Sequence, residues 1–248
     1  MRILFAGPSL AGVIDEVQRD DPELIIAGPV VWGDVAKAVL DGATTIGIID
    51  GCFEQTRSVW HKEILFALSE GVSVAGAASM GALRAAECAQ FGMIGIGQVF
   101  QMYHSGELVD DSDVALVHAT HEFGYQPLSE PRVNILATLN AMRADKMIST
   151  LEWQSAKTAA RRTHYAELNF SSVLGSLPII ELRRVQRLIA WANQHRVNTK
   201  QQDAMQLVEW IKLPETKFAP PGDWSFSQSS QWRAMISDIK NATALQSP

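Results

Sequence analysis

The sequence predicts an α/β fold, a Rossmann-like parallel sheet with crossover helices, followed by a mostly helical C-terminal region. Short apolar runs alternate with helical patterns through the first third of the chain, and each run ends in glycine. From Ser129 onward the patterns are almost all helical. Short strands separated by helices are typical of parallel sheets, because parallel neighbours need crossover connections.

The same patterns place each element along the chain. We expect strands at residues 3–6, 23–27, 45–49, 72–75 and 114–119. Helices are expected at 10–19, 33–41, 57–70, 81–90, 97–104, 130–143, 151–168, 179–194, 200–211 and 232–240, with a loop at 214–224. This order predicts an α/β core over residues 1–125 and a helical C-terminal region over residues 126–248.

Composition is that of a globular protein, since 47% of the 248 residues are hydrophobic and 19% are charged. No apolar run reaches the roughly 18 residues of a membrane span, and the first residues predict a strand rather than a signal peptide. Cys52 and Cys88 form no Cys-x-x-Cys pair. We therefore expect a reduced, cytoplasmic protein with no structural zinc site and no membrane partner.

Charge is distributed unevenly between the two halves. Residues 1–125 carry 6 Lys and Arg against 17 Asp and Glu, whereas residues 126–248 carry 15 against 10. The acidic first half argues against a nucleic-acid partner. The basic second half either docks an acidic protein or is a solvated helix surface, and the sequence leaves both interpretations open.

Polar residues stand at the ends of the predicted strands. Because ligand sites of open parallel sheets lie beyond the carboxyl ends of the strands, these ends are the candidate site. They are Gly7–Ser9, Gly28, Asp50-Gly51 and Gly76–Ser79. The need for tight turns explains the glycines, but it does not explain Asp50 and Ser79.

Ser79 lies in a strand–turn–helix segment, residues 76–87, that reads GAASMGALRAAE. Ala77-x-Ser79-x-Gly81 has the form of a nucleophile elbow with alanine in the first glycine position. A helix that starts beside the serine presents backbone N–H groups to a developing oxyanion. The alternative is that Ser79 only caps the helix.

A serine nucleophile needs a base, and His61 is the candidate. We expect His61 to face Ser79, with Asp50 or Glu63 orienting its ring. Alternatively, His61 is an ordinary helix-face residue. Cys52 is a competing nucleophile or a persulfide carrier if the pKa of its thiol is lowered.

Arg84 follows Ser79 by about one helical turn and is expected to reach the same cleft. The alternative is a surface ion pair with Glu87, three residues further along. A third polar segment holds Asp110, Asp111 and Asp113, followed by His118, His121 and Glu122. Its spacing matches neither HExxH nor an EF-hand, which favours capping and turn residues over a metal site.

Five motifs of this chain together resemble the TfuA family. They are Gly7–Leu10, Gly33-Asp34, Ile49–Phe53, His61–Leu65 and Ala78–Glu87, and the resemblance continues through Gly92-Met93, Gly95-x-Gly97 and the acidic residues 110–113. The similarity covers about residues 1–125. The chain departs from the family pattern at Val30-Val31-Trp32, where prolines are expected, and at Cys52, which occupies a variable position and so is not a required sulfur carrier.

The resemblance implies a partner of a YcaO enzyme in backbone thioamidation of peptides. Such a protein is expected to hydrolyse the C-terminal thiocarboxylate of a ThiS-like, ubiquitin-fold sulfur carrier and to deliver sulfide, without a cofactor or metal. In this role Ser79 would attack, His61 would take the proton, and the Met80 and Gly81 amides would hold the oxyanion. Arg84 would bind the anionic thiocarboxylate, and Gly7, Ser9 and Gly51 would complete the substrate site.

Two other functions remain open. The chain could be a non-catalytic adaptor that binds and activates the YcaO enzyme. It could also be an unrelated small-molecule hydrolase or nucleotide-binding α/β protein, although the turn at Gly7–Ser9 lacks both GxGxxG and a P-loop.

Overall fold

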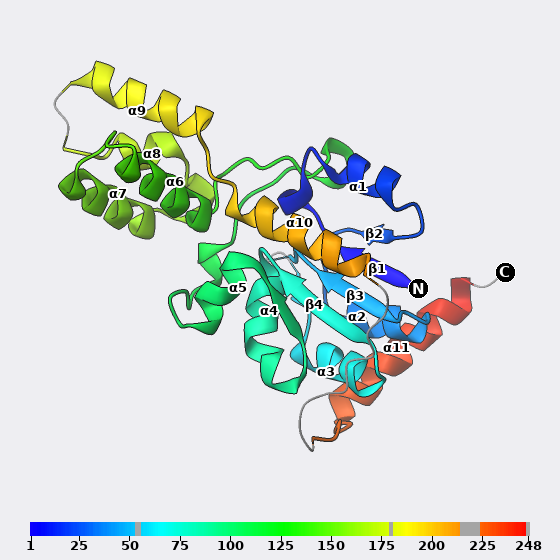
Figure 1. The fold of residues 1–248 in the computed structure, drawn as a ribbon. Coiled ribbons are helices and arrows are strands. Elements are labelled where there is room, and N and C mark those ends of the chain that lie inside the picture. The colour runs from blue at the N-terminus through cyan, green and yellow to red at the C-terminus, as the bar shows by residue number, and fades with distance from the viewer. Residues whose placement is uncertain (53–55, 179–180, 214–223, 247–248) are drawn as a thin grey trace.

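A computed structural model describes residues 1–52, 56–178, 181–213 and 224–246 (Figure 1). Its centre is a parallel five-stranded sheet in the order β2-β1-β3-β4-β5. The strands are β1 (Arg2–Phe5), β2 (Ile25–Ala27), β3 (Thr45–Ile48), β4 (Ser73–Ala77) and β5 (Ile94–Ile96). The predicted Rossmann-like α/β class is confirmed, and the four strands predicted in the first third of the chain are all present.

One strand was missed and one was predicted wrongly. β5 is an edge strand of three residues between Gly92 and Gly97, too short for a recognisable alternation. The expected strand at 114–119 is absent, since its one ladder contact among the described residues is an isolated bridge between His118 and Pro127. Its apolar residues are buried for another reason, because Val114 and its neighbours form the wall of a cavity.

Helices cover both faces of the sheet. On one face the core is shared by α2 (Asp34–Leu40), α3 (His61–Ser69), α4 (Met80–Cys88) and α5 (Gly97–His104). On the other face α1 (Ile14–Asp20) and α10 (Thr199–Ile211) pack against the side chains of β1 and β4. Burial of both faces explains why the strands read as continuous apolar runs rather than as an alternation.

Four helices from the second half of the chain form a lobe beside the sheet, at the left of Figure 1. α6 (Arg132–Ala144), α7 (Thr150–Arg162), α8 (Phe170–Leu174) and α9 (Leu182–Gln194) share a separate apolar core. The chain then returns to the sheet with α10, which crosses its face. The division into two regions at residue 125 stays a prediction. The helix α10 comes from the second half of the chain, yet it packs against the sheet of the first half.

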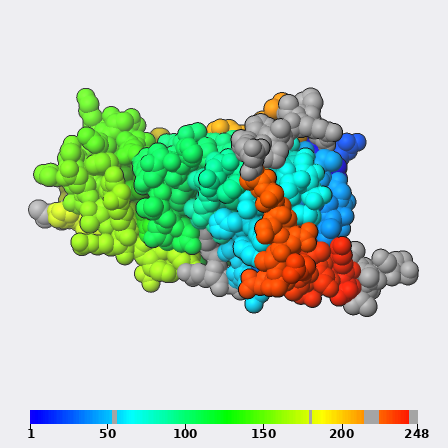
Figure 2. All heavy atoms as spheres, turned by 90° about the horizontal axis from the view of Figure 1, so that it is seen from below, coloured from blue at the N-terminus to red at the C-terminus, as the bar shows by residue number. Residues whose placement is uncertain are grey.

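The last helix, α11 (Ser230–Gln246), lies over the outer surface of α2 and α3 (Figure 2). Trp232 and Met235 are buried there against Ala36, and the Trp232 ring lies 4.9 Å from that of Phe66. The helix is longer than the predicted 232–240. Most of the predicted loop at 214–224, and the start of the predicted helix at 179–194, lie outside the described residues.

Asp203 joins α10 to the start of α5. Its carboxylate accepts hydrogen bonds from the backbone N–H groups of Gln98 at 2.9 Å and Val99 at 2.7 Å. We expect Asp203→Ala to lower the free energy of unfolding by about 1–3 kcal/mol, because one buried and one partly buried backbone donor lose their acceptor. Urea titration measures the change, with Asp145→Ala, at an exposed position, as the control. Equal effects of the two substitutions would contradict this role for Asp203.

Candidate functional site

The turn between β4 and α4 is tight and strained. Ala78 has a φ of 66°, and the N–H of Ser79 donates to the carbonyl of Ala77 at 2.7 Å, which is the hydrogen bond of a γ-turn. The strained residue is therefore Ala78 and not the serine, in contrast to the predicted elbow with Ser79 at its tip. Such strain persists only where the surrounding packing fixes it, and it marks this turn as a candidate functional position.

Ser79 precedes α4, but its side chain does not cap the helix. Its carbonyl accepts from the N–H groups of Ala82 at 3.0 Å and Leu83 at 3.2 Å, so Ser79 occupies the N-cap position through its backbone. Its hydroxyl does not take part in capping. Ser79 is 2% exposed, and within the described residues its hydroxyl makes no hydrogen bond. Without a protein partner, the hydroxyl is available to bond a molecule in the space that it faces.

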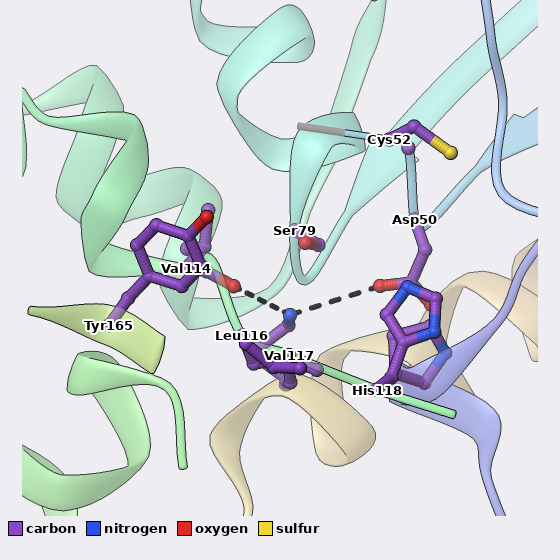
Figure 3. A pocket seen from close by; sticks show the side chains of 11 residues that line it. Asp50, Cys52, Ser79, Val114, Leu116, Val117, His118 and Tyr165 are labelled. Atoms are coloured by element: carbon purple, nitrogen blue, oxygen red, sulfur yellow. Dashed lines mark hydrogen bonds and ion pairs between the residues drawn. The ribbon is translucent and has the colours of Figure 1, made fainter. Parts of the chain in front are cut away.

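The hydroxyl belongs to a cavity of about 50 Å³ beyond the carboxyl ends of β3 and β4 (Figure 3). This volume has room for only a few water molecules. Its lining comes from strand ends, the segment after α5, the turn between α7 and α8, and α10: Pro8, Asp50, Gly51, Cys52, Ser79, Val114, Leu116, Val117, His118, Tyr165 and Lys200. The strand-end argument thus brings Asp50, Gly51 and Ser79 together as predicted.

Asp50 is buried and fully occupied by the first turn. Its carboxylate accepts from the N–H groups of Gly7 and Ser9, both at 2.9 Å, and from the Ser9 hydroxyl at 2.7 Å. The expectation that Asp50 orients His61 is therefore wrong. The expectation that Gly7 and Ser9 bind substrate also loses its basis, because the amides of both residues and the hydroxyl of Ser9 are committed to Asp50.

Lys200 enters the same cavity from the start of α10. It is 2% exposed, and its Nζ donates to the carbonyl of Val114 at 2.7 Å and lies 3.8 Å from Asp50 Oδ1. Burial lowers the pKa of Lys200, while the negative charges of Asp50 and Glu130 act in the opposite direction. Sequence reasoning missed this residue, because a lysine that starts an amphipathic helix looks like a solvated one.

The expected pair of His61 and Ser79 does not form. His61 Nε2 lies 2.7 Å from Glu87 Oε2, and Arg84 donates to Glu87 at 2.6 Å and to the carbonyl of Val59 at 3.2 Å. His61, Arg84 and Val59 line a different, wider pocket of about 620 Å³, which α11 also lines. Arg84 is therefore not placed to bind an anion beside Ser79, and its surface pairing with Glu87 is the alternative that the structure shows.

Charge within that surface cluster is mutually stabilising. Partial burial acts to raise the pKa of Glu87, but the hydrogen bonds from His61 and Arg84 outweigh it and hold that pKa below its usual range. The three side chains connect the first turn of α3 to α4. His61 lies in that first turn, since α3 begins at His61 rather than at the predicted residue 57.

Glu63 holds two helix starts together. It is fully buried and accepts from the N–H groups of Gly33 and Trp60 at 3.0 Å and of Ala36 at 3.2 Å. Burial raises the pKa of its carboxyl, although these three donors oppose the shift. Glu63 therefore makes no contact with His61 of the kind that the predicted triad required.

The two amides expected to form an oxyanion hole differ in their contacts. The N–H of Gly81 donates to the carbonyl of Ile49 at 3.1 Å, so it is not available. Within the described part of the chain, the N–H of Met80 donates no hydrogen bond. The Met80 side chain is buried, and a Cβ on Gly51 would lie 2.8 Å from its Cγ. Gly51 thus shapes the cavity by leaving room for Met80.

A family model described as TfuA-like protein matches residues 50–168. Residues 50–168 identify the chain as TfuA-like. No curated protein of similar sequence was found. The matched segment begins at Asp50 and contains Ser79, the cavity wall from Val114 to His118, and Tyr165, whereas Lys200 lies outside it.

Cys52 of the TfuA-like chain lines the cavity but has no feature of an activated thiol. Burial raises the pKa of its thiol, and the negative charges of Asp34 and Asp50 raise it further. The protonated thiol is a weak nucleophile, so the environment of Cys52 gives no support to a persulfide carrier.

The acidic segment of the TfuA-like chain is used for local structure. Asp110 accepts from the N–H of Ser112 at 2.9 Å, and Asp113 lies 2.7 Å from Arg132. Among the described residues, no three or more His, Cys, Asp and Glu side chains are grouped as a metal site. His118 lines the Ser79 cavity instead, with its Nδ1 2.7 Å from the carbonyl of Ala119. In the same part of the chain, no helix is long and apolar enough to span a membrane.

Proposed function

We propose that this TfuA-like protein hydrolyses the C-terminal thiocarboxylate of a ThiS-like, ubiquitin-fold carrier and supplies sulfide to a YcaO enzyme for backbone thioamidation. The family supports an accessory role of this kind. The observation that carries the enzymatic part is the hydroxyl of Ser79, which has no hydrogen-bond partner among the described residues and lines a cavity with Asp50 and Lys200.

Thiocarboxylate hydrolysis suits this cavity. Ser79 attacks the carbonyl carbon, the resulting oxyanion accepts a hydrogen bond from the Met80 amide, and sulfide leaves. Water then cleaves the serine ester, which returns the proton to Ser79 and releases the carrier as a carboxylate. The sum is one thiocarboxylate and one water converted to one carboxylate and one hydrogen sulfide, with no change of oxidation state.

Access requires movement of the cavity wall. Ser79 and Lys200 are each 2% exposed, and the enclosed volume of about 50 Å³ does not hold a peptide tail. The wall on the outer side is the segment from Val114 to His118, which belongs to no strand among the described residues. It is held by the His118–Pro127 bridge and by hydrogen bonds of Val117 with Leu128 and Ser129. A glycine-rich tail has the narrow cross-section that a small displacement of this segment would admit.

The test is sulfide release from a thiocarboxylated ThiS-type carrier, followed with a sulfide-reactive dye and by mass spectrometry of the carrier. We expect wild-type protein to convert the thiocarboxylate to a carboxylate and, in isotopically labelled water, to incorporate the label into it. Absence of release, both alone and with the YcaO enzyme added, would exclude the hydrolase.

His61→Ala is expected to keep the rate of sulfide release within about threefold of wild type. The reason is that His61 pairs with Glu87 and Arg84 and lines a different pocket from Ser79. Steady-state rates at saturating carrier check this prediction. A loss as large as that of a nucleophile would restore His61 to the catalytic machinery and contradict the geometry.

A non-catalytic adaptor for the YcaO enzyme is the second candidate. It is favoured by apolar side chains on the segment that follows the cavity wall, since Phe123 is 72% and Leu128 is 68% exposed. For an adaptor, Phe123→Ser and Leu128→Ser would weaken activation of the YcaO enzyme supplied with free sulfide. For the hydrolase, YcaO activity with free sulfide would not depend on these residues.

A further inference from the structure

A second cavity, the Thr199 cavity, lies where the helical lobe meets the sheet. Its volume is about 110 Å³, and its lining comes from α5, the turn after α5, α6, α7 and the first residue of α10. It is distinct from the Ser79 cavity, because the two share no lining residue. A volume of this size has room for several water molecules or for one small organic molecule.

The hydroxyl of Thr199 is buried without a partner. Thr199 is 2% exposed, and its Oγ1 is one of two buried side-chain polar atoms among the described residues that make no hydrogen bond. An unpaired hydroxyl inside a protein is unfavourable, so a bound molecule is the simplest reason for it. Thr199 is also the first residue of α10, a helix end at which the backbone dipole favours a negative charge.

Hydrogen-bond donors with free capacity surround the same cavity. Within the part of the chain that the structure describes, neither Arg161 nor Lys157 makes an ion pair, and the Lys157 ammonium lies 5.0 Å from the centre of the Trp153 ring. Asn140 accepts from Trp153 Nε1 at 2.9 Å, which leaves its amide N–H groups free to donate. Glu107 is the one acidic residue in the described lining, and it is exposed. The lining therefore favours an anion.

The rest of the lining is largely apolar. It consists of Met102, Leu108, Val133, Leu136 and Ala137, of which Leu108 and Val133 are buried. Apolar surface gains free energy when carbon atoms rather than water cover it, and a bare inorganic ion would leave it uncovered. Apolar walls with a few charged or polar groups that fix orientation are typical of sites for small organic molecules.

We propose that the Thr199 cavity binds a small organic carboxylate with a short apolar body. The carboxylate pairs with the Arg161 guanidinium, whose parallel N–H groups match its two oxygens, and accepts a hydrogen bond from the Thr199 hydroxyl. The apolar body lies on the wall formed by α5 and α6. No step of the proposed hydrolysis takes part, so the site can be tested whether or not the protein releases sulfide.

Pentanoate is the probe, and its uncharged analogue pentanamide is the matched control. We expect wild-type protein to bind pentanoate with a Kd of about 1 mM, an ordinary affinity for so small a molecule. Saturation-transfer NMR measures this binding. At ten times that Kd the midpoint of thermal unfolding should rise by about 3–5 °C relative to sodium chloride of equal ionic strength. Pentanamide and inorganic phosphate should each bind at least about tenfold more weakly, because each lacks one half of the match.

Arg161→Met and Arg162→Met are the matched pair of variants. The two arginines are adjacent and exposed, but Arg162 lines a different pocket. Arg161→Met should weaken pentanoate binding by about tenfold or more, whereas Arg162→Met should bind as wild type does.

Thr199→Val keeps the shape of the side chain but removes the hydroxyl. It should weaken pentanoate binding by about threefold or more, because the carboxylate loses a hydrogen bond. Without pentanoate, this variant should unfold at the wild-type temperature or above it, because the removed hydroxyl had no partner. A Thr199→Val protein that unfolds well below wild type without pentanoate would contradict the proposed contact.

The proposal is overturned if wild-type protein shows no saturable binding of pentanoate, or if Arg161→Met binds it as tightly as wild type does. Equal binding of pentanamide would show that charge plays no part, and tighter binding of phosphate would show that the apolar wall plays none; either result also overturns it. None of these measurements depends on sulfide release, so failure of this inference is separate from failure of the proposed function.

Discussion

Replacing Ser79 with alanine should lower sulfide release by about a hundredfold or more and leave the protein folded. The loss of rate follows from removal of the nucleophile. The fold should survive because the Ser79 hydroxyl makes no hydrogen bond within the described residues, so that its removal leaves no partner unsatisfied. We expect the free energy of unfolding to change by less than about 1 kcal/mol.

The matched control for this substitution is Ser69→Ala. Ser69 ends α3, and its hydroxyl donates to the carbonyl of Phe66 at 2.8 Å on the exposed surface. Its removal should not alter sulfide release. Release and urea unfolding measured on both variants distinguish a catalytic from a structural serine. A Ser79→Ala protein that releases sulfide at the wild-type rate would remove the nucleophile from the mechanism and favour an adaptor.

Gly81→Ala should destabilise the protein by about 4 kcal/mol or more. A Cβ at residue 81 would lie 1.8 Å from the backbone oxygen of Ile48, and one at Gly76 would lie 2.0 Å from the oxygen of Gly81. β3, β4 and α4 therefore meet at backbone contact, where neither side can move without breaking the sheet. Loss of soluble protein or a large fall in the urea midpoint is the expected measurement.

Gly71→Ala separates this steric effect from the general effect of losing a glycine. Gly71 has a φ of 79°, and no atom lies within 4 Å of an added Cβ. The substitution should destabilise by only about 1–2 kcal/mol, the energy of placing alanine in a left-handed conformation. If Gly81→Ala is no worse than Gly71→Ala, the close packing of α4 on the sheet is not what fixes the Ser79 turn.

Local pattern predicted the strands and, through them, part of the site. Asp50 and Ser79 follow neighbouring strands, and parallel strand ends meet at one edge of a sheet, so their proximity followed from topology. β5 was missed because three residues carry too little periodicity, and residues 114–119 were assigned to a strand because burial in a cavity wall produces the same apolar run. His61 was paired with Ser79 because histidine is the usual base of a serine nucleophile, and the order of residues in the chain does not show which side chain reaches the serine.

The sequence by itself determined the α/β class, the edge of the sheet that holds the cavity, and the serine turn that faces it. These depend on residues close together in the chain, whose periodicity and turn chemistry act locally. Only the tertiary structure decided which basic group accompanies Ser79. Lys200 reaches the cavity because α10 packs on the sheet through Leu207 and Val208 and is joined to α5 by Asp203. That docking depends on surfaces contributed by distant segments, and no local pattern encodes it.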